Sequence, residues 1–256
     1  MRKNKLRESL QAGRRVFGTF VSTPEPAVVE MIGWAGYDFV IIDMEHSPID
    51  FGQLPRLLAA AENVDLAPLV RVGSSAANPI LRVLDSGAVG VVVAHVRNRE
   101  EALATVSACR YPPLGKRGVS GASRAAGYGY NNFADHVRQS NDEVLTIALI
   151  EDQSGVESIE EIVNVPGLDV ICPGAGDLSA SLGLVGQPQH PTVQASVERV
   201  VQAVNARREQ VLGCHVMEPS QLGRCLELGA QFIIYSQDSR VIFHAYKTAL
   251  EVLRSE

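Results

Sequence analysis

Short apolar segments recur through the whole chain, and each is followed by a segment of amphipathic character. The apolar segments are residues 16–21, 38–43, 67–72, 89–94, 145–151, 168–172, 211–216 and 231–235. They are rich in Val and Ile and lack strict polar alternation, which is typical of strands covered on both faces. Such strands belong to parallel sheets, so the chain must supply a crossover between each strand and the next.

The intervening segments supply these crossovers as predicted amphipathic helices. They span residues 25–35, 51–61, 77–86, 100–109, 156–163, 192–208, 219–228 and 239–253. Eight alternations of strand and helix predict one α/β domain, a (β/α)8 TIM barrel over residues 1–256. A doubly wound sheet is the competing fold, but it normally carries a glycine-rich turn after its first strand, and FVSTP at 20–24 is not one.

Charge and hydropathy exclude two classes of partner. The chain carries 23 Lys and Arg against 29 Asp and Glu, a net charge of −6, whereas nucleic-acid binding favours a basic surface. Its longest apolar run, residues 88–94, is far shorter than the roughly 20 residues that cross a bilayer. The N-terminal segment is polar, with charges of both signs, and does not lead into an apolar core. We therefore expect a cytoplasmic protein with no nucleic-acid or membrane partner.

The four cysteines stand at positions 109, 172, 214 and 225, a spacing that matches no zinc-binding or CxxC motif. We expect them to be reduced and mostly buried as small apolar side chains.

Polar residues gather where the predicted strands end. Asp43, Glu45 and His46 follow the second strand, Arg71 lies in the third, Glu151 ends the fifth and Asp177 comes shortly after the sixth. Reactive groups of (β/α)8 barrels lie at the carboxyl ends of the strands. We therefore expect these side chains to converge at one mouth of the barrel.

Glu151 and Asp177 are the candidate metal ligands. Two carboxylates from neighbouring strands, completed by water and substrate oxygens, suit a hard divalent cation. For either residue alone, a helix cap or a loop salt bridge is the alternative. The turn that contains Gly176 and Asp177 also offers successive backbone N–H groups to a substrate carboxylate.

His46 is the best general acid–base candidate, because imidazole titrates near neutral pH. Asp43, three residues earlier, or Asp85 would orient its ring. The histidines at the ends of the fourth and seventh strands, His95 and His215, are further candidates for the pocket wall.

Arg71 within an apolar strand requires an anionic partner, because a buried guanidinium is costly when it is unpaired. That partner is either a substrate oxyanion or, structurally, the carboxylate of Asp43 or Glu45.

One connection, residues 110–142, is too long for a simple turn. It contains glycines, aromatic residues and the basic side chains Arg110, Lys116, Arg117 and Arg124. We expect it to cover an anionic site, and the alternative is a surface excursion with a solvated basic face.

Several of these motifs occur together in one known family. The segments IIDMEHSP, PLVRV, RYPPLGKRGVS, IALIE and PGAGDLSASLG, with GQPQHPTVQ and LELGAQF, resemble the metal-dependent pyruvate aldolases of the HpcH/HpaI family. The resemblance runs from about Leu10 to the C-terminus. It implies a barrel of the phosphoenolpyruvate/pyruvate type that cleaves a 4-hydroxy-2-oxo acid to pyruvate and an aldehyde. The implied cofactor is Mg²⁺, Mn²⁺ or Co²⁺.

The resemblance also implies roles for individual residues. Glu151 and Asp177 would bind the cation, Arg71 would contact the pyruvate enolate oxygen, and His46 with Asp43 or Asp85 would handle the proton. The backbone around Gly176 and Asp177 would bind the pyruvate carboxylate.

Other activities remain open beside the aldolase. Met44, Leu149 and Ala175 stand where this family commonly has other residues. The same enolate would serve an oxaloacetate decarboxylase or a CoA-thioester lyase, and Leu149 and Ala175 leave open a non-catalytic barrel that binds pyruvate. Schiff-base chemistry is not expected, because the only lysines stand at 3, 5, 116 and 247, outside the predicted strands.

The last predicted helix, residues 239–253, carries an apolar stripe. Val241, Ile242, Tyr246, Ala249 and Leu253 form it. Because the resembling proteins are hexamers that exchange this helix, we expect a homo-oligomer, a trimer or hexamer, with this helix in subunit contacts. The alternative is packing on the chain's own barrel wall.

Overall fold

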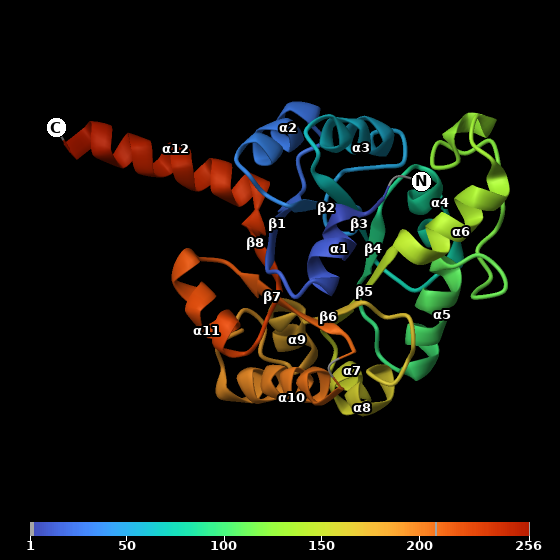
Figure 1. Ribbon diagram of the computed structural model, residues 1–256. Coiled ribbons are helices and arrows are strands. Elements are labelled where there is room, and N and C mark those ends of the chain that lie inside the picture. Colours follow the sequence, from blue (N-terminus) through green and yellow to red (C-terminus); the bar gives the residue numbers. More distant parts are fainter. Residues whose placement is uncertain (1–2, 208, 256) are drawn as a thin grey trace.

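The computed structural model, which describes residues 3–207 and 209–255, is a closed barrel of eight parallel strands (Figure 1). Each strand pairs with its neighbours in the sequence, and β8 pairs with β1 to close the barrel. The strands are β1 Val16–Val21, β2 Phe39–Asp43, β3 Ala67–Val72, β4 Gly90–Val93, β5 Leu145–Ile150, β6 Val170–Pro173, β7 Val211–Val216 and β8 Phe232–Gln237. All eight predicted strands are present, which confirms the (β/α)8 prediction.

Helices connect consecutive strands on the outside of the barrel (Figure 1). They are α2 Pro26–Trp34, α3 Leu54–Asn63, α4 Ala77–Asp85, α5 Arg99–Cys109, α7 Gln153–Glu157, α8 Ile159–Ile162, α10 Pro191–Arg207 and α11 Leu222–Glu227. The helix predicted at 156–163 is divided into α7 and α8 at Ser158, and α11 is preceded by a 3-10 turn, η2 Pro219–Gln221. The last residue of the helix predicted at 192–208, Arg208, lies outside the described residues.

Four elements are absent from the sequence prediction: α1 Lys5–Gln11, η1 Gly127–Gly129, α6 Phe133–Glu143 and α9 Ala175–Ser181. Both α1 and α9 have only seven residues, so their apolar spacing is too short to identify a helix.

The core has two layers. Side chains that point into the barrel form the inner layer, in which the rings of Phe39 and Phe232 stack with centroids 4.2 Å apart. A Cβ atom at Gly18 would lie 2.2 Å from the ring of Phe39, so this strand position requires glycine. The outer layer lies between the strands and the helices and contains mostly Val, Leu and Ile. This packing holds the strand ends, and therefore the site above them, in fixed positions.

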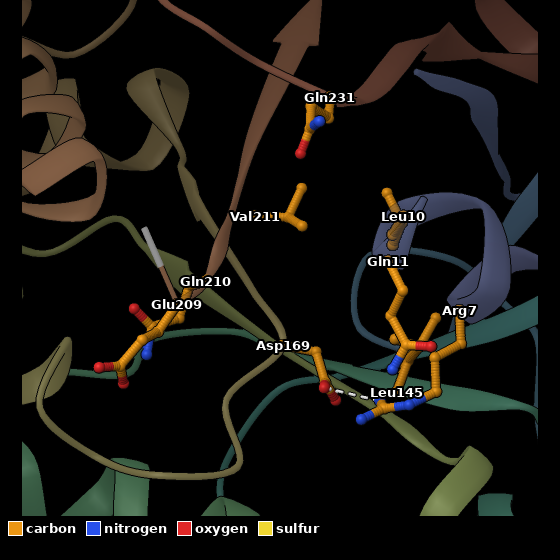
Figure 2. A pocket seen from close by; sticks show the side chains of 9 residues that line it. All are labelled: Arg7, Leu10, Gln11, Leu145, Asp169, Glu209, Gln210, Val211 and Gln231. Atoms are coloured by element: carbon orange, nitrogen blue, oxygen red, sulfur yellow. Dashed lines mark hydrogen bonds and ion pairs between the residues drawn. The ribbon is translucent and has the colours of Figure 1, made fainter. Parts of the chain in front are cut away.

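Helix α1 covers the amino end of the barrel. Its Arg7 pairs with Asp169, 2.6 Å away, and Asp169 also accepts a hydrogen bond from the backbone N–H of Thr146. A cavity of about 310 Å³ remains beside this ion pair, between α1 and the start of β7 (Figure 2). Leu10 and Val211 are among the residues that line it.

Residues 110–142 also lie at the amino end, which corrects the expectation that they cover an anionic site within the same chain. The segment leaves α5 and enters β5, and in a (β/α)8 barrel such connections lie opposite the catalytic mouth. Three of its basic side chains are engaged there in ion pairs: Arg110 with Asp169, Arg117 with Asp85, and Arg124 with Glu62.

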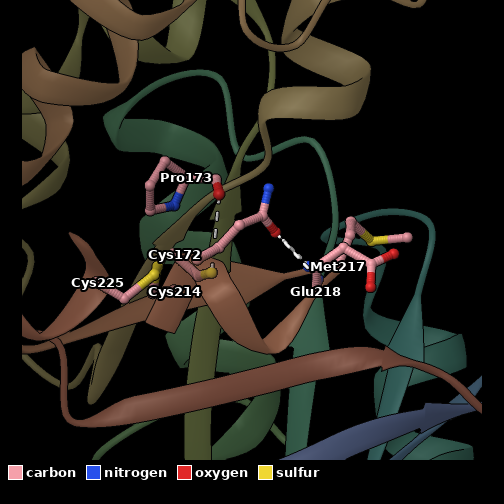
Figure 3. The surroundings of a disulfide bond; sticks show 7 residues. Cys172, Pro173, Cys214, Met217, Glu218 and Cys225 are labelled. Carbon is pink, nitrogen blue, oxygen red and sulfur yellow. Dashed lines mark hydrogen bonds between the residues drawn. A yellow bond between two sulfur atoms is a disulfide. The ribbon is translucent and has the colours of Figure 1, made fainter. Parts of the chain in front are cut away.

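The cysteines differ in part from the prediction. Cys109 and Cys172 are free and buried, as expected. Cys214 of β7 and Cys225 of α11 form a disulfide, with Cα atoms 6.0 Å apart (Figure 3). The expectation that all four are reduced is therefore wrong. Packing of α11 against β7 brings the two side chains together, and no sequence motif indicates that contact.

The last helix, α12 Asp238–Ser255, projects away from the barrel (Figure 1). Its large apolar side chains are exposed, among them Phe243, Tyr246 and Leu253, the last two being 77% and 73% exposed. The alternative that this helix packs on its own barrel is therefore wrong. None of the helices in the described part of the chain has the length and apolar character needed to cross a membrane.

Candidate active site

Asp43 and Arg71 form a bidentate ion pair at the carboxyl end of the barrel. Arg71 donates from Nε to Asp43 Oδ1 at 2.9 Å and from Nη2 to Oδ2 at 2.7 Å. The register of β2 and β3 places the two residues opposite each other, and their side chains are 1% and 11% exposed. Burial alone would raise the pKa of Asp43, but the bonds from Arg71 outweigh it and hold this pKa below its usual value.

The structural alternative for Arg71, an ion pair with Asp43, is thus present in the molecule. The guanidinium also lies 4.6 Å from the ring centroid of Phe20, which fixes its plane. Asp43 engages Nε and one N–H of Nη2, so Nη1 and the second N–H of Nη2 are available to a substrate oxyanion.

His46 lies in the loop after β2, and its side chain is 56% exposed at the mouth. Its backbone N–H donates to Asp43 Oδ1 at 3.3 Å, so Asp43 holds the loop, whereas the carboxylate itself is bonded to Arg71. Asp85 is the last residue of α4 and therefore lies at the amino end of the barrel, close to the start of β4. It pairs there with Arg117 at 2.7 Å. Neither aspartate is bonded to the His46 ring, contrary to the expectation that one of them orients it.

Two residues to which the sequence assigned no part in the chemistry, Glu45 as a possible partner of Arg71 and His95 as a candidate for the pocket wall, lie in the middle of the cluster. His95 Nε2 is 3.5 Å from Glu45 Oε1, and its Nδ1 is 2.9 Å from Asp152 Oδ2. His95 has φ +56°, a strained conformation for a non-glycine residue, and its backbone N–H donates to Glu151 Oε1 at 3.0 Å. The available signal was position: His95 follows β4 and Glu45 stands next to His46.

Glu151 follows β5 and is 3% exposed. Its pKa is raised to about 7, chiefly by burial and also by the nearby carboxylates of Asp177 and Glu45, and His95 opposes these effects. A Cβ atom at position 174 would lie 2.6 Å from Glu151 Oε2, so Gly174 is required for the turn after β6 to approach this carboxylate.

Asp177 lies in the first turn of α9, directly after that turn. Leu178 is the first residue whose N–H donates within the helix, to Gly174 at 3.0 Å. The N–H groups of Ala175, Gly176 and Asp177 precede it and are therefore the unpaired N–H groups of a helix start. They suit a substrate carboxylate, as the sequence predicts for Gly176 and Asp177.

The charges of the site favour a cation. Five carboxylates, from Asp43, Glu45, Glu151, Asp152 and Asp177, surround Arg71 and two histidines. Glu45 Oε2 is buried without a hydrogen-bond partner.

The donors fit a hard divalent ion rather than a closed metal cage. Within residues 3–207 and 209–255, no three His, Cys, Asp or Glu side chains form a ready metal cluster. Mg²⁺ commonly uses one or two carboxylates and completes its shell with water and substrate oxygens. Glu151 and Asp177 meet that description.

Comparison with known proteins decides the family. A family model described as HpcH/HpaI aldolase/citrate lyase matches residues 16–245. The chain belongs to this family. A hydroxypyruvate/pyruvate aldolase from Paraburkholderia phytofirmans is 36% identical over 98% of both chains. A 4-hydroxy-2-oxo-heptane-1,7-dioate aldolase from Salmonella dublin is 32% identical over 94% of this chain and 90% of its own.

Solved structures share the fold. A crystal structure of the citrate synthase SbnG matches with a TM-score of 0.89 and 34% identity, covering 98% of this chain and 97% of that one. The resemblance drawn from the sequence motifs is thereby confirmed, and the chain is an aldolase or lyase of the HpcH/HpaI family.

Proposed function

We propose that this HpcH/HpaI protein is a divalent-metal-dependent aldolase that cleaves a 4-hydroxy-2-oxo acid to pyruvate and an aldehyde. The observation that carries the proposal is the buried carboxylate of Glu151, close enough to Asp177 for their charges to interact, at the mouth that also holds Arg71. The mouth thus combines several carboxylates with one oriented guanidinium and one exposed imidazole.

Each residue would have a distinct task in carbon–carbon cleavage. Glu151 and Asp177 would hold the cation, which would supply positive charge to stabilise the enolate oxygen. The unpaired N–H groups at the start of α9 would bind the substrate carboxylate. Arg71 would donate from Nη1 to the oxygen that gains charge as the C3–C4 bond breaks.

His46 would take the proton of the 4-hydroxyl group and later return it to C3 of the pyruvate unit. Its exposure at the mouth supports this task, because the aldehyde half of the substrate must enter and leave from that side.

Pyruvate release tests the proposal. Lactate dehydrogenase and NADH would follow pyruvate formed from several 4-hydroxy-2-oxo acids, with Mg²⁺, Mn²⁺ or Co²⁺ added. We expect activity that excess EDTA abolishes, that Glu151→Gln removes, and that the matched control Glu160→Gln keeps. Glu160 is a surface residue of α8, 63% exposed and paired with Arg199. Full activity in EDTA after extended dialysis would contradict the proposal.

The same assay separates the alternative activities. Pyruvate from oxaloacetate but from no hydroxy-oxo acid would indicate the decarboxylase, and a CoA thioester as the sole substrate would indicate the CoA-thioester lyase. Tight pyruvate binding by calorimetry without turnover would indicate the non-catalytic barrel.

We also propose that the protein is a homo-oligomer in which α12 packs on another copy. An apolar groove of about 410 Å³ lies between α2 and α11, with Phe17, Leu222 and Tyr235 among its lining residues. The projecting α12 leaves this sector of the wall uncovered (Figure 1). The groove and the exposed side chains of α12 are both apolar, so contact between two copies would remove both from water.

Light scattering would test the assembly. We expect a trimer or hexamer for the full chain and smaller species for Tyr246→Glu. The exposed control Lys247→Glu, one residue along the same helix, would keep the assembly. A monomeric full chain at micromolar concentration would refute the proposal.

A further inference from the structure

His215 points into the barrel near the carboxyl end of β7, and the reaction outlined above gives it no task. Side chains of a strand point alternately to its two faces. Cys214 and Val216 pack in the outer layer between strands and helices, whereas Val211 packs in the inner layer. His215 therefore faces the inside of the barrel, where its ring lies edge-on to that of Phe20 with centroids 5.5 Å apart.

The His215 ring forms part of the wall of the mouth. It is exposed to solvent although it points inward. The ring of Phe20 that it contacts also packs on the guanidinium of Arg71, so His215 lies one aromatic ring away from the group proposed to bind the enolate oxygen. Inner-layer side chains near the carboxyl ends of β4, β5 and β6 are apolar, namely Ala94, Leu149 and Cys172. His215 is thus a polar group next to an apolar floor.

The ring of His215 is uncharged at neutral pH. The barrel wall encloses most of it, and this loss of hydration lowers its pKa to about 4. The charge of Arg71 lowers the pKa as well, and a hydrogen bond to the backbone of Ser236 opposes both effects. Because that bond favours the protonated ring, the ring is its donor, and the carbonyl oxygen of Ser236 accepts.

The other ring nitrogen of His215 is then an acceptor, since a neutral imidazole has one donor and one acceptor nitrogen. Within residues 3–207 and 209–255, no side-chain hydrogen bond or ion pair involves this ring. A carboxylate or a carbonyl oxygen of the substrate cannot pair with it, because those groups also only accept. A hydroxyl group of the substrate supplies the missing donor.

We propose that His215 is a specificity-determining residue that accepts a hydrogen bond from a substrate hydroxyl other than the 4-hydroxyl deprotonated by His46. The proposal rests on the aldolase function proposed above, and it names the substrate class. The additional hydroxyl belongs either to the 2-oxo acid, on the carbon next to the oxo group, or to the aldehyde. The ring holds this hydroxyl without taking its proton, because so weak a base is poorly matched to neutral pH.

Two pairs of substrates test the proposal in the direction of carbon–carbon bond formation. Hydroxypyruvate and 2-oxobutanoate form the 2-oxo acid pair, and glycolaldehyde and propanal form the aldehyde pair. In each pair a hydroxyl group replaces a methyl group of similar size. For the metal-supplied enzyme, we expect kcat/KM to favour the hydroxylated member of one pair by about 10-fold. The pair that shows the preference identifies the half of the substrate that carries the hydroxyl.

Two variants at the same position show whether His215 is responsible. His215→Leu should remove the preference and leave kcat/KM for the methyl-bearing members nearly unchanged. The matched control His215→Gln returns an acceptor, its amide oxygen, and should restore part of the preference. Equal kcat/KM within both wild-type pairs, or a preference that His215→Leu keeps, would overturn the proposal. An equal fall for all four substrates in His215→Leu would make the residue structural and overturn it as well.

A spectroscopic measurement separates this proposal from the proposed activity. In protein labelled with ¹⁵N-histidine, the His215 resonances are assigned by their loss in His215→Leu. Each 2-oxo acid is added with Mg²⁺ alone, and each aldehyde is added with Mg²⁺ and pyruvate. The resonance of the acceptor nitrogen should move with a hydroxylated compound and stay in place with its methyl-bearing counterpart.

A His215 resonance that moves with neither hydroxylated compound overturns the proposal even in an active enzyme. A selective shift in a protein that forms no aldol product supports His215 and refutes the aldolase. Should His215→Leu fail to fold, His215→Gln provides the same assignment.

Discussion

Arg71→Lys is the substitution that most sharply separates catalysis from architecture in this barrel. Lysine keeps the positive charge but replaces a planar fork with a single flexible ammonium group. In the structure Arg71 makes two bonds to Asp43, and both it and Asp43 are buried. The change therefore removes at least one charge-assisted hydrogen bond from a carboxylate that water cannot reach.

The expected loss of stability follows from that geometry. One hydrogen bond to a charged group contributes about 1.5–3 kcal/mol, so unfolding should become easier by about 2 kcal/mol. For a chain of this size, that corresponds to a Tm lower by about 4–8 °C. The expected loss of catalysis is larger: removing one oriented donor to a developing oxyanion typically costs about 10²–10³ in kcat, with little effect on KM.

Both quantities should be measured on one preparation, kcat by pyruvate release and Tm by circular dichroism. Asp43→Asn is the control, because it weakens the same ion pair but leaves the guanidinium in place. It should lower Tm by a similar amount and kcat by less. A lower Tm with wild-type kcat per folded Arg71→Lys molecule would make Arg71 purely structural and refute its place in the reaction.

Three further predictions follow from the site. His46→Ala should lower kcat about 10²–10⁴-fold while pyruvate binding by calorimetry is nearly kept, and an unchanged kcat would make His46 structural. The pKa of Glu151 is raised to about 7 from 4.5, so folding favours its protonated form and stability falls as pH rises towards and through 7. In EDTA, the free energy of unfolding should therefore decrease between pH 5 and pH 8, by at most about 3 kcal/mol, and Tm should fall with it. A wild-type Tm that stays constant over this range, as expected for Glu151→Gln, would contradict this prediction. Borohydride with pyruvate should label no lysine, since the strands contain none, and a stable adduct would replace the metal mechanism with a Schiff base.

The barrel was predictable because its signal is local and repeated. Eight Val- and Ile-rich segments in series leave few arrangements for a chain of this length. The same regularity located the carboxyl ends of the strands, and with them Arg71, Glu151 and Asp177. Short helices such as α9 were not predicted, because two helical turns contain too few apolar positions to show a periodicity.

Pairings between side chains could not be predicted in the same way. The sequence offered Asp43 to both Arg71 and His46, and Asp85 to His46, whereas in the structure Asp43 pairs with Arg71 and Asp85 with Arg117. The basic residues of 110–142 suggested an anion site from their composition, although the predicted order, a helix before the segment and a strand after it, already placed it opposite the mouth. The disulfide of Cys214 and Cys225 depends on how one helix packs on one strand.

The separation of α12 from the barrel has a consequence for synthesis in the cell. Strand β1 must wait for β8, the last strand to be translated, before the barrel can close. Apart from Asp238, which accepts hydrogen bonds from Ser22 and Thr23 after β1, the residues of α12 add nothing to the buried core of that barrel. A newly made subunit can therefore complete its core before α12 meets another copy, and the apolar side chains of that helix stay exposed to chaperones until they are covered.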